Sequence, residues 1–377
     1  MRESIGRAAS VAATGLFAMA VNADDAVAPD PQTIEVVREM GLLEGPVALR
    51  DMPGWRAPRK IVLTGLGNLD AMKAVAPGVE FIVVKGPKEM AAQAADADAI
   101  FSGDDVVCDD RVLAAAKNVR WVAVYSAGVE SCLGKPALER PGVTVTNMRA
   151  VAGPVMAEHT IALAYALARG LQVSIARQAR GEGWGGGFAG SQPQSLTGKT
   201  LLVVGLGGTG LEVAERAHGL GMEVIATRAS SREGPAYVKH VGLSVELPTL
   251  IAQADVVVAT LPLTPATTNL FDAKMFARMK KSAFFINVGR GGSVVTDDLV
   301  AALNNGVIAG AGLDVTEPEP LPKDHPLWKA KNIIITPHMA PLSDLGQATR
   351  VLLLREQLRR FATGDKLLAV VDFKKGY

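Results

Sequence analysis

Residues 200–210 read Thr-Leu-Leu-Val-Val-Gly-Leu-Gly-Gly-Thr-Gly. The apolar run 200–204 predicts a buried strand, and 209–219 has the composition of a helix. The glycines between them have the G-x-G-x-x-G spacing: the first permits a tight turn, the second lets a pyrophosphate approach the backbone, and the third lets helix and strand pack closely. This order predicts a dinucleotide site at a helix N-terminus, although a glycine-rich turn can also serve plain chain reversal. The residues expected to bind the dinucleotide are Gly205, Gly207, Gly208, Thr209 and Gly210.

Short apolar runs continue in both directions from this turn. They are rich in Val and Ile with little alternation, which is typical of strands covered on both faces by helices, and so of parallel α/β sheets. The strands expected on the N-terminal side are 61–64, 81–84, 99–101, 121–125 and 143–146. Those expected after the glycine turn are 223–227, 255–260, 283–288, 310–313 and 332–336.

The segments between the strands predict how the chain is divided. Residues 158–180 lack Pro and predict one long helix, 181–198 around Trp184 and Phe188 predict a loop, and 351–361 predict a helix that returns to the first series. The expected fold class is α/β with two doubly wound parallel-sheet domains, a Rossmann dinucleotide-binding domain inserted into a flavodoxin-like substrate and catalytic domain. The expected boundaries are 1–30 for a leader or disordered segment, 31–152 plus 340–377 for the substrate domain, and 153–339 for the dinucleotide domain.

The end of strand 223–227 favours one dinucleotide. An acidic residue about 20 positions after the glycines would hold the ribose 2′-hydroxyl of NAD, whereas Arg accommodates the 2′-phosphate of NADP. Here Arg228 follows the strand and Ser230, Ser231 and Arg232 come next, with no carboxylate at the strand end. Guanidinium and hydroxyl groups donate hydrogen bonds to phosphate, so we expect NADP(H) in preference to NAD(H). A solvated basic turn is the alternative.

Composition narrows the class of ligand. The 377 residues include 39 Lys and Arg against 38 Asp and Glu, a balance that provides no electrostatic footprint for nucleic acid or an anionic membrane. A small-molecule substrate is therefore expected. Cys108 and Cys132 have neither zinc-site nor disulfide-framework spacing, so we expect two buried thiols and no metal site.

The N-terminus leaves the compartment open. Arg2 and Arg7 precede an apolar, Ala-rich stretch at 8–20, and Val-Asn-Ala at 21–23 has the small residues of a signal-peptidase site. An export signal and a disordered start both fit this pattern. The supply of NADP(H) favours a cytoplasmic protein, with the periplasm as the alternative. No other stretch approaches the ~18 consecutive apolar residues of a membrane-spanning helix.

Three polar residues follow strands of the second series. Arg290 comes after 283–288, Glu319 after 310–313, and His338 after 332–336. Ligands of open α/β sheets bind at the carboxyl ends of the strands, so these side chains are expected to converge. Imidazole titrates near neutral pH, which makes the group suitable for acid/base chemistry.

With these motifs the sequence resembles the D-isomer-specific 2-hydroxyacid dehydrogenase family, and especially its glyoxylate/hydroxypyruvate reductase branch. The resemblance covers most of the chain after about Lys60 and is specific because several motifs occur together. The segments that carry it, besides the glycine turn and the three polar residues, are Ser126–Val129, Met156–His159, Leu196–Lys199, Leu261–Pro265 and the closing 359–377.

The resemblance implies the division of chemical labour. His338 would exchange the proton on the substrate oxygen, Glu319 would hydrogen-bond and orient its imidazole, and Arg290 would bind the carboxylate and polarise the carbonyl. Reduction of a 2-oxo acid develops negative charge on an oxygen, which a cationic Arg and a protonated His both stabilise. The family further implies cofactor contacts by Leu261, Pro262, Thr267, Val288 and Asp314, and a homodimer assembled through the dinucleotide domains.

The substrate loop is also implied by resemblance. Backbone amides of Ala127, Gly128 and Val129 would help bind the substrate carboxylate. Asn147 would line the same cleft, or else be an ordinary turn residue. His159 is expected to be a helix-start residue rather than a catalyst.

One departure and several alternatives remain. The family usually continues after its catalytic His with Ile-Gly-Ser, but here Met339-Ala-Pro-Leu-Ser343 follows, which leaves the substrate preference open. A non-catalytic, dinucleotide-sensing scaffold like the corepressors of this fold is the second hypothesis. Formate is disfavoured as a substrate because that branch has Gln at the position of Glu319. The sequence does not identify the acid or the direction of the reaction.

Overall fold

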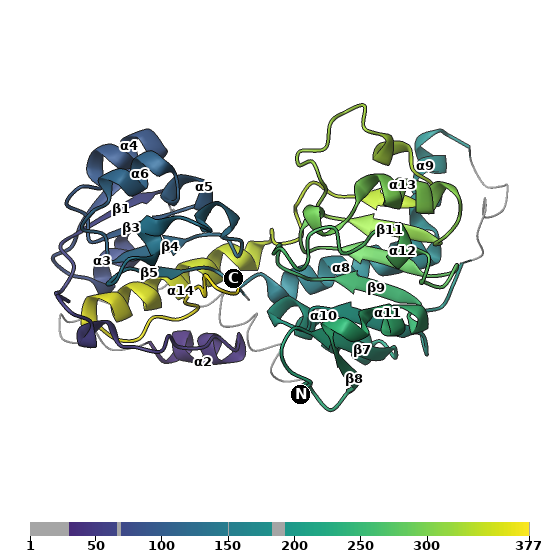
Figure 1. The fold of residues 1–377 in the computed structure, drawn as a ribbon, viewed down its shortest axis with the longest axis horizontal. Coiled ribbons are helices and arrows are strands. Elements are labelled where there is room, and N and C mark those ends of the chain that lie inside the picture. The colour runs from purple at the N-terminus through teal and green to yellow at the C-terminus, as the bar shows by residue number, and fades with distance from the viewer. Residues whose placement is uncertain (1–29, 66–68, 150, 183–192, 377) are drawn as a thin grey trace. The chain divides into compact units, whose positions relative to one another are not determined.

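The computed structural model describes residues 30–65, 69–149, 151–182 and 193–376. The expected leader (1–29 of 1–30) and the part of the predicted loop that contains Trp184 and Phe188 lie outside the described residues. The chain divides into two compact units, Met1–Val151 with Ser343–Tyr377 and Ala152–Leu342. Each is a parallel α/β layer structure (Figure 1).

The first unit has a five-stranded sheet in the order β2-β1-β3-β4-β5, and every pair of neighbours is parallel. The strands are β1 (Lys60–Thr64), β2 (Glu80–Val84), β3 (Ala99–Ser102), β4 (Trp121–Val124) and β5 (Thr144–Thr146). The helices are α2 (Pro31–Glu39), α3 (Leu69–Val75), α4 (Pro87–Gln93), α5 (Asp104–Val107), α6 (Asp110–Ala115), α7 (Pro136–Glu139) and α14 (Asp344–Thr363), with short 3-10 helices η2 (Leu49–Asp51) and η3 (Glu130–Cys132).

Both faces of this sheet are buried because neighbouring strand residues point to opposite sides. Ile61 and Leu63 of β1 pack with α2, α3 and α14, whereas Val62 packs with α4 to α7. Trp121 fills the centre of the first layer, where its ring centroid lies 5.0 Å from that of Phe361. Strands that are mostly apolar on both faces therefore form a two-sided core.

The second unit has a seven-stranded parallel sheet in the order β12-β11-β10-β9-β6-β7-β8. The strands are β6 (Thr200–Val204), β7 (Glu223–Arg228), β8 (Val238–Leu243), β9 (Val256–Ala259), β10 (Phe284–Asn287), β11 (Gly310–Leu313) and β12 (Ile333–Ile335). The helices are α8 (Gly153–Arg169), α9 (Leu171–Ala179), α10 (Gly208–Gly219), α11 (Leu247–Leu250), α12 (Ala273–Phe276) and α13 (Thr296–Asn304), with 3-10 helices η4 (Ser244–Glu246), η5 (Ile251–Gln253), η6 (Gly291–Ser293) and η7 (Pro326–Lys329).

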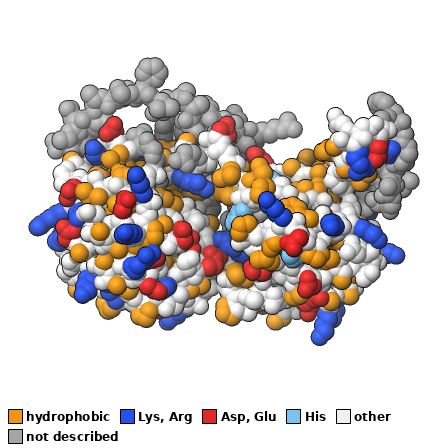
Figure 2. Space-filling model, turned by 90° about the horizontal axis from the view of Figure 1, so that it is seen from above, with side chains coloured by type: hydrophobic (Ala, Val, Ile, Leu, Met, Phe, Trp, Pro, Cys, Tyr) orange, Lys and Arg blue, Asp and Glu red, His pale blue; other side chains and the backbone are white. Residues whose placement is uncertain are grey.

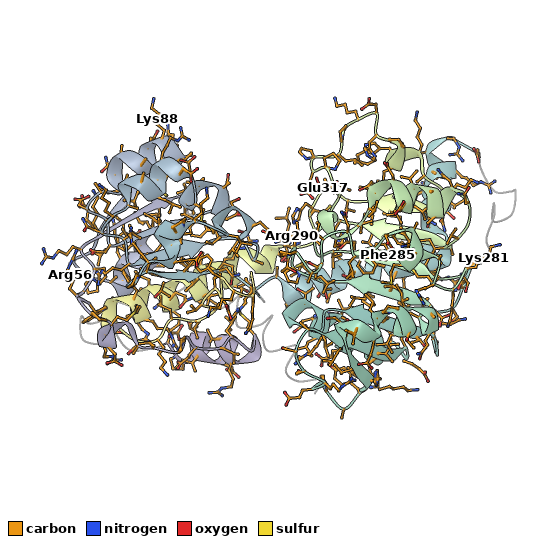
Figure 3. All side chains as sticks on the ribbon, viewed as in Figure 1. Arg56, Lys88, Lys281, Phe285, Arg290 and Glu317 are labelled. Atoms are coloured by element: carbon orange, nitrogen blue, oxygen red, sulfur yellow. A yellow bond between two sulfur atoms is a disulfide. The ribbon has the colours of Figure 1, made fainter. Side chains whose placement is uncertain are left out.

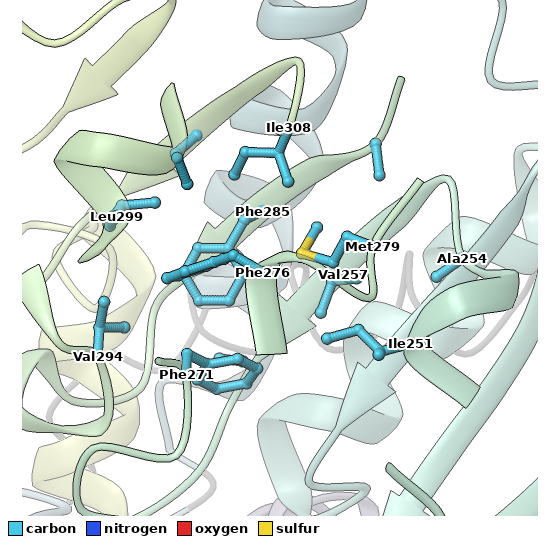
Figure 4. Close-up of a cluster of buried hydrophobic side chains, with 14 of the residues drawn as sticks. Ile251, Ala254, Val257, Phe271, Phe276, Met279, Phe285, Val294, Leu299 and Ile308 are labelled. Carbon is cyan, nitrogen blue, oxygen red and sulfur yellow. The ribbon is translucent and has the colours of Figure 1, made fainter. Parts of the chain in front are cut away.

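Helices α8 and α10 cover one face of this sheet, and α11 to α13 cover the other. Figure 4 shows the second core layer, in which Phe271 and Phe276 pack against Phe285 with ring centroids 4.8 and 5.4 Å apart. The predicted α/β class with two doubly wound parallel sheets is confirmed.

The predicted long helix differs from the structure in two ways. The single helix expected at 158–180 is two helices, because Gly170 adopts a left-handed conformation (φ 66°) that ends α8. The structure also begins α8 earlier, at Gly153, where Pro154 occupies a first-turn position that needs no N–H donor. Strand β8 was not predicted, since it carries polar side chains at an edge of the sheet.

The expectation of two free thiols was wrong. Cys108, which ends α5, and Cys132, which ends η3, form a disulfide with Cα atoms 5.1 Å apart. Both side chains are buried, as expected, but the bond joins residues 24 positions apart that only the packing of η3 on α5 brings together.

Charges of both signs lie on the face of the molecule drawn in Figure 2. Figure 2 shows basic and acidic side chains intermixed on the face in view, in keeping with 39 Lys and Arg against 38 Asp and Glu. Among the described residues, no helix is both long and apolar enough to cross a membrane.

Candidate active site

The predicted site residues of the second unit lie at one edge of its sheet. The strands are all parallel, so the segments that follow β6, β7, β9, β10, β11 and β12 emerge at the same side. Figure 3 shows Arg290 at this edge of the unit, directly beyond β10. This is the side at which open α/β sheets bind ligands.

The predicted glycine turn joins β6 to α10 and is tightly packed at two of its glycines. Gly205 has φ 102°, and a Cβ on Gly210 would lie 2.3 Å from the Gly205 carbonyl oxygen. These two glycines are therefore required by the fold itself. A Cβ on Gly207 would meet nothing within 4 Å, so no packing contact within the fold requires a glycine there. Gly208 and Thr209 form the start of α10, whose N-terminal amides favour an anion.

The basic turn after β7 lies against this glycine turn. Arg228 Nε donates a hydrogen bond to the Leu206 carbonyl at 2.8 Å, which draws its guanidinium over the turn. Arg232 instead pairs with Glu246 of η4 at 2.6 Å. The hydrogen bond from Arg232 is the largest cause, and the hydrogen bond from the Leu243 amide the next, that lowers the pKa of the Glu246 carboxyl to about 2. Ser230 is exposed.

Glu246 is a carboxylate that reasoning from the strand end missed, because it lies 18 positions after Arg228, on a different element. It engages one of the two guanidiniums that were expected to meet a phosphate. The structure thus separates Arg228, which lies over the glycine turn, from Arg232, which already has an anionic partner.

The loop after β9 is held by its own hydrogen bonds. Thr267 Oγ1 donates to the Pro262 carbonyl at 2.7 Å and accepts from the Thr264 amide at 2.8 Å. Leu261 packs against the next loop, since a Cβ on Gly289 would lie 2.7 Å from the Leu261 carbonyl oxygen. Val288 is 1% exposed and belongs to the core, so its side chain is not available to a ligand.

The catalytic candidates in the loops that follow β11 and β12 are in contact. His338 Nδ1 lies 2.5 Å from Glu319 Oε1, and the second Glu319 oxygen faces the Thr316 amide at 3.4 Å. His338 has φ 50°, a left-handed conformation that non-glycine residues seldom adopt. Both side chains remain partly exposed, at 44% and 39%. The imidazole is therefore oriented by a carboxylate and still accessible.

Asp314 holds the loop that contains His338. Its carboxylate accepts hydrogen bonds from Thr336 Oγ1 at 2.6 Å and from the amides of Met339 and Ala340 at 2.9 Å each. Its carbonyl accepts from the His338 amide at 2.8 Å. These bonds make Asp314 a residue that holds the left-handed backbone of His338 in place, and its predicted contact with the cofactor stays a prediction.

His159 adds a contact that sequence reasoning missed. Its Nε2 lies 2.9 Å from Thr336 Oγ1 and 3.6 Å from Asp314 Oδ1. The histidine comes from α8, 177 positions before Thr336, so no local pattern could join them. Only the Met-Ala-Glu-His segment pointed to this part of the helix. His159 thus contacts Thr336 and Asp314, which hold the loop that contains His338, and is more than a residue at the start of a helix.

Arg290 lies in the loop after β10, next to a glycine that contacts the loop after β11. A Cβ on Gly291 would lie 1.9 Å from the Thr316 carbonyl oxygen, so the loops after β10 and β11 touch backbone to backbone. Thr316 in turn faces Glu319, which faces His338. The Arg290 guanidinium donates to the Gly289 carbonyl at 2.8 Å. The three predicted residues therefore occupy consecutive loops at one sheet edge.

The predicted substrate loop lies in the first unit, after β4. Asn147 donates to the Ala127 carbonyl at 2.7 Å, and Ser126 Oγ donates to the Gly128 carbonyl at 2.8 Å. Asn147 is 2% exposed and Val129 is also buried. Asn147 therefore fixes the shape of the loop. The segment that follows this loop, η3, ends at Cys132, which forms the disulfide with Cys108.

Comparison with known proteins supplies independent information. A family model described as "D-isomer specific 2-hydroxyacid dehydrogenase, NAD binding domain" matches residues 161–340. A glyoxylate reductase from Korarchaeum cryptofilum is 34% identical over 304 residues, or 79% of this chain and 87% of that protein. A glyoxylate reductase/hydroxypyruvate reductase from Homo sapiens is 33% identical over 265 residues, or 69% and 79%. An uncharacterized protein from Corynebacterium melassecola is 41% identical over 179 residues, but these are only 59% of its length.

Solved structures give the same picture. A glyoxylate reductase from Paecilomyes thermophila has a TM-score of 0.73 at 25% identity, with 84% of this chain and 99% of that chain covered. An NADPH-dependent glyoxylate/hydroxypyruvate reductase from Sinorhizobium meliloti, in complex with NADP and sulfate, has a TM-score of 0.69 at 27% identity, with 85% and 100% covered.

Proposed function

The chain belongs to the D-isomer specific 2-hydroxyacid dehydrogenase family and is thus an oxidoreductase of CH–OH donors that uses NAD or NADP, and from this premise we propose that it interconverts a small 2-oxo acid with its D-2-hydroxy acid using NADP(H). Glyoxylate and hydroxypyruvate are the proposed substrates. The observation that carries the proposal is the contact between His338 and Glu319 at the sheet edge that also bears Arg290 and the glycine turn.

The contact defines which atom moves the proton. With Nδ1 of His338 directed at Glu319, Nε2 is the nitrogen left to protonate the substrate carbonyl oxygen in reduction, and to accept the proton in oxidation. When bound, the nicotinamide supplies the hydride to the carbonyl carbon of the substrate in reduction, and accepts it from that carbon in oxidation. Arg290 would bind the substrate carboxylate and stabilise the negative charge that develops on the carbonyl oxygen.

Asp314 and His159 are proposed as positioning residues. They touch Thr336 and the amides beside His338, and so act on the reaction through the backbone of the catalytic loop. Exposed Met339 and Leu342 follow the histidine in the segment where the family usually has Ile-Gly-Ser. We propose that these two side chains adjust the preference among 2-oxo acids.

The preference for NADP(H) is supported mainly by Arg228. Its guanidinium lies over the turn expected to hold the pyrophosphate, near where the adenosine ribose of a dinucleotide begins. Ser230, Ser231 and Arg232 add donors, although Arg232 must share its charge with Glu246. NAD(H) is the alternative cofactor.

The experiment is a screen of NADPH oxidation against glyoxylate, hydroxypyruvate, pyruvate and bulkier 2-oxo acids, with the His338→Gln variant in parallel. The proposal expects turnover of at least one small acid that the variant loses. Binding of NADPH without turnover of any acid would instead favour the dinucleotide-sensing scaffold.

Assembly and compartment are proposed on narrower grounds. A homodimer through the dinucleotide unit is proposed from the family, and α9 exposes Leu171 and Ile175, which such an interface would bury. Light scattering after gel filtration tests it. The supply of NADP(H) supports a cytoplasmic location, whereas the Cys108–Cys132 disulfide is typical of oxidising compartments and supports the periplasmic alternative. Thiol trapping in intact cells tests the cytoplasmic location, and a pair trapped as a disulfide would contradict it.

A further inference from the structure

Three ionisable side chains meet beside the basic turn that follows β7. Oε1 of Glu246, in η4, lies 2.6 Å from Nη2 of Arg232, and Oε2 lies 3.2 Å from Nε2 of His240 on β8. Strand β8 is the edge strand next to β7 (Figure 1). A single carboxylate therefore contacts both the basic turn and the edge of the sheet.

The fold holds the carboxylate of Glu246 in place. Its Oε1 also accepts a hydrogen bond from the Leu243 amide at 2.8 Å. The side chain packs on Gly242 of β8, since a Cβ on that glycine would lie 3.3 Å from the Glu246 Cβ. The side chain of Glu246 is 30% exposed, whereas that of Arg232 is 55% exposed. The acid is thus the fixed member of the pair, and the guanidinium is the member that can move to a ligand.

Glu246 would keep other donors if Arg232 left it. Its pKa is lowered to about 2, chiefly by the hydrogen bond from Arg232, so the carboxylate is charged at neutral pH. A charged carboxylate only accepts hydrogen bonds, so Nε2 of His240 is the donor in its contact with Oε2. The Leu243 amide remains on Oε1. Loss of the guanidinium would therefore leave each carboxylate oxygen with one donor.

The other arginine of the turn has different partners. Arg228 donates to the Leu206 carbonyl at 2.8 Å and lies 3.4 Å from Ser231 Oγ, and within the described part of the chain no carboxylate is paired with it. Arg232 directly follows Ser231. A phosphate bound by Arg228 and Ser231 would thus lie beside Arg232 and would compete with Glu246 for that guanidinium. The charge of Glu246 would also repel the phosphate.

We propose that Glu246 is a specificity-determining residue for the cofactor, which reduces the preference for NADP(H) by competing with the 2′-phosphate for Arg232. The inference rests on the proposed function, in which the basic turn binds this phosphate. A carboxylate at the end of β7 would favour NAD outright. Here the carboxylate comes from η4 and engages one guanidinium of two. The protein therefore binds NADP(H) more tightly than NAD(H), but by a smaller factor than two free arginines would provide.

The test is calorimetric titration of the full chain with adenosine 2′,5′-bisphosphate and with adenosine 5′-monophosphate, which differ only in the 2′-phosphate. Neither probe transfers a hydride, so the affinities are measured apart from catalysis. Glu246→Gln removes the charge and keeps an acceptor for the Leu243 amide. In this variant we expect the bisphosphate to bind roughly two- to fivefold more tightly, the range of one exposed ion pair, and the affinity for the monophosphate to stay unchanged.

A double-mutant cycle assigns the effect to Arg232. Arg232→Ala should weaken bisphosphate binding by a larger factor in the Glu246→Gln background than in the wild type, because only there is the guanidinium released from its carboxylate. Glu223→Gln is the matched control. It removes the same charge from another ion pair of this unit, with Lys239, at the opposite end of β7 from Arg228. The control should leave both affinities unchanged.

The outcomes separate this inference from the proposed function. An unchanged bisphosphate affinity in Glu246→Gln, or the same gain when Arg232 is already Ala, would overturn the inference and leave the preference for NADP(H) in place. A weaker affinity would also overturn it, because Glu246 would then position Arg232 for the phosphate. Equal binding of the two probes in the wild type and in every variant would overturn both the inference and the proposed cofactor.

Discussion

The Nδ1 atom of His338 lies 2.5 Å from Oε1 of Glu319. The backbone of His338 itself has a left-handed conformation, which hydrogen bonds to Asp314 hold in place. One ring nitrogen is thereby committed to the carboxylate, and the other is directed away from it. Since Asp314 holds the amides of the two residues that follow, the imidazole is oriented from both its ring and its backbone.

Two glycines at the site, Gly291 and Gly207, should respond differently to a methyl group. Gly291→Ala should lower the free energy of unfolding by about 3 kcal/mol, because its Cβ would overlap the Thr316 carbonyl. Gly207→Ala should leave stability within about 0.5 kcal/mol, since its Cβ meets open space. It should nevertheless weaken NADPH binding roughly tenfold or more, by keeping the pyrophosphate from the backbone amides.

Urea unfolding and NADPH fluorescence titration of both variants measure these effects. Equal loss of stability in the two would show that the Gly207 position is set by packing. Unchanged NADPH affinity in Gly207→Ala would mean that the turn does not hold the dinucleotide.

The two arginines after β7 should contribute unequally to cofactor choice. Arg228→Ala should raise the KM for NADPH roughly tenfold and that for NADH by less than about twofold, because only NADPH carries the 2′-phosphate. Arg232→Ala should have the smaller effect, since its guanidinium is bound to Glu246. Initial rates with both cofactors at fixed glyoxylate provide the comparison, and a larger effect at Arg232 would reverse this ranking.

The disulfide should stabilise the first unit without affecting the second. Its 24-residue separation closes a loop for which the chain-entropy model gives about 3 kcal/mol. Reduction, or the double change Cys108→Ala with Cys132→Ala, should lower the urea midpoint of that unit and leave NADPH affinity unchanged. Two titratable thiols in the native, non-reduced protein would show that the bond is absent.

Acid should destabilise the first unit through Asp98. Burial by itself would raise the pKa of Asp98, but hydrogen bonds from the Arg59 amide, Arg120 and the Lys60 amide outweigh it and hold that pKa below its ordinary value. A lowered pKa in the folded state stabilises the fold at pH values above the ordinary value of 3.8, and this stability disappears as the pH falls toward the lower value.

Asp98→Asn should therefore cost about 3 kcal/mol at pH 7, where it breaks a buried ion pair, and less as the pH falls below 4. Asp96→Asn is the matched control, because Asp96 is exposed and meets only Lys60. Urea unfolding between pH 3 and pH 7 measures both variants. A difference for Asp98→Asn that did not depend on pH would remove the carboxylate from this role.

The features that could be predicted from the sequence are those whose residues are close together in the chain. The turn at Gly205–Gly210 has its glycine spacing within six neighbouring residues, and Arg290, Glu319 and His338 each follow an apolar strand within three to six residues. The contacts of His159 with Thr336, of Glu246 with Arg232 and of Cys108 with Cys132 join distant positions. They result from the packing of elements, which a linear pattern does not contain.

The central claim is that His338, oriented by Glu319, transfers the proton that accompanies hydride transfer. The most direct measurement is the single-turnover rate of NADPH oxidation by glyoxylate in Glu319→Gln, with Glu317→Gln of the same loop as control. We predict a rate reduced roughly 10²- to 10⁴-fold in Glu319→Gln, the range expected of acid/base catalysis, with NADPH affinity unchanged and the control near wild type. Equal single-turnover rates in Glu319→Gln and the wild type would contradict the account.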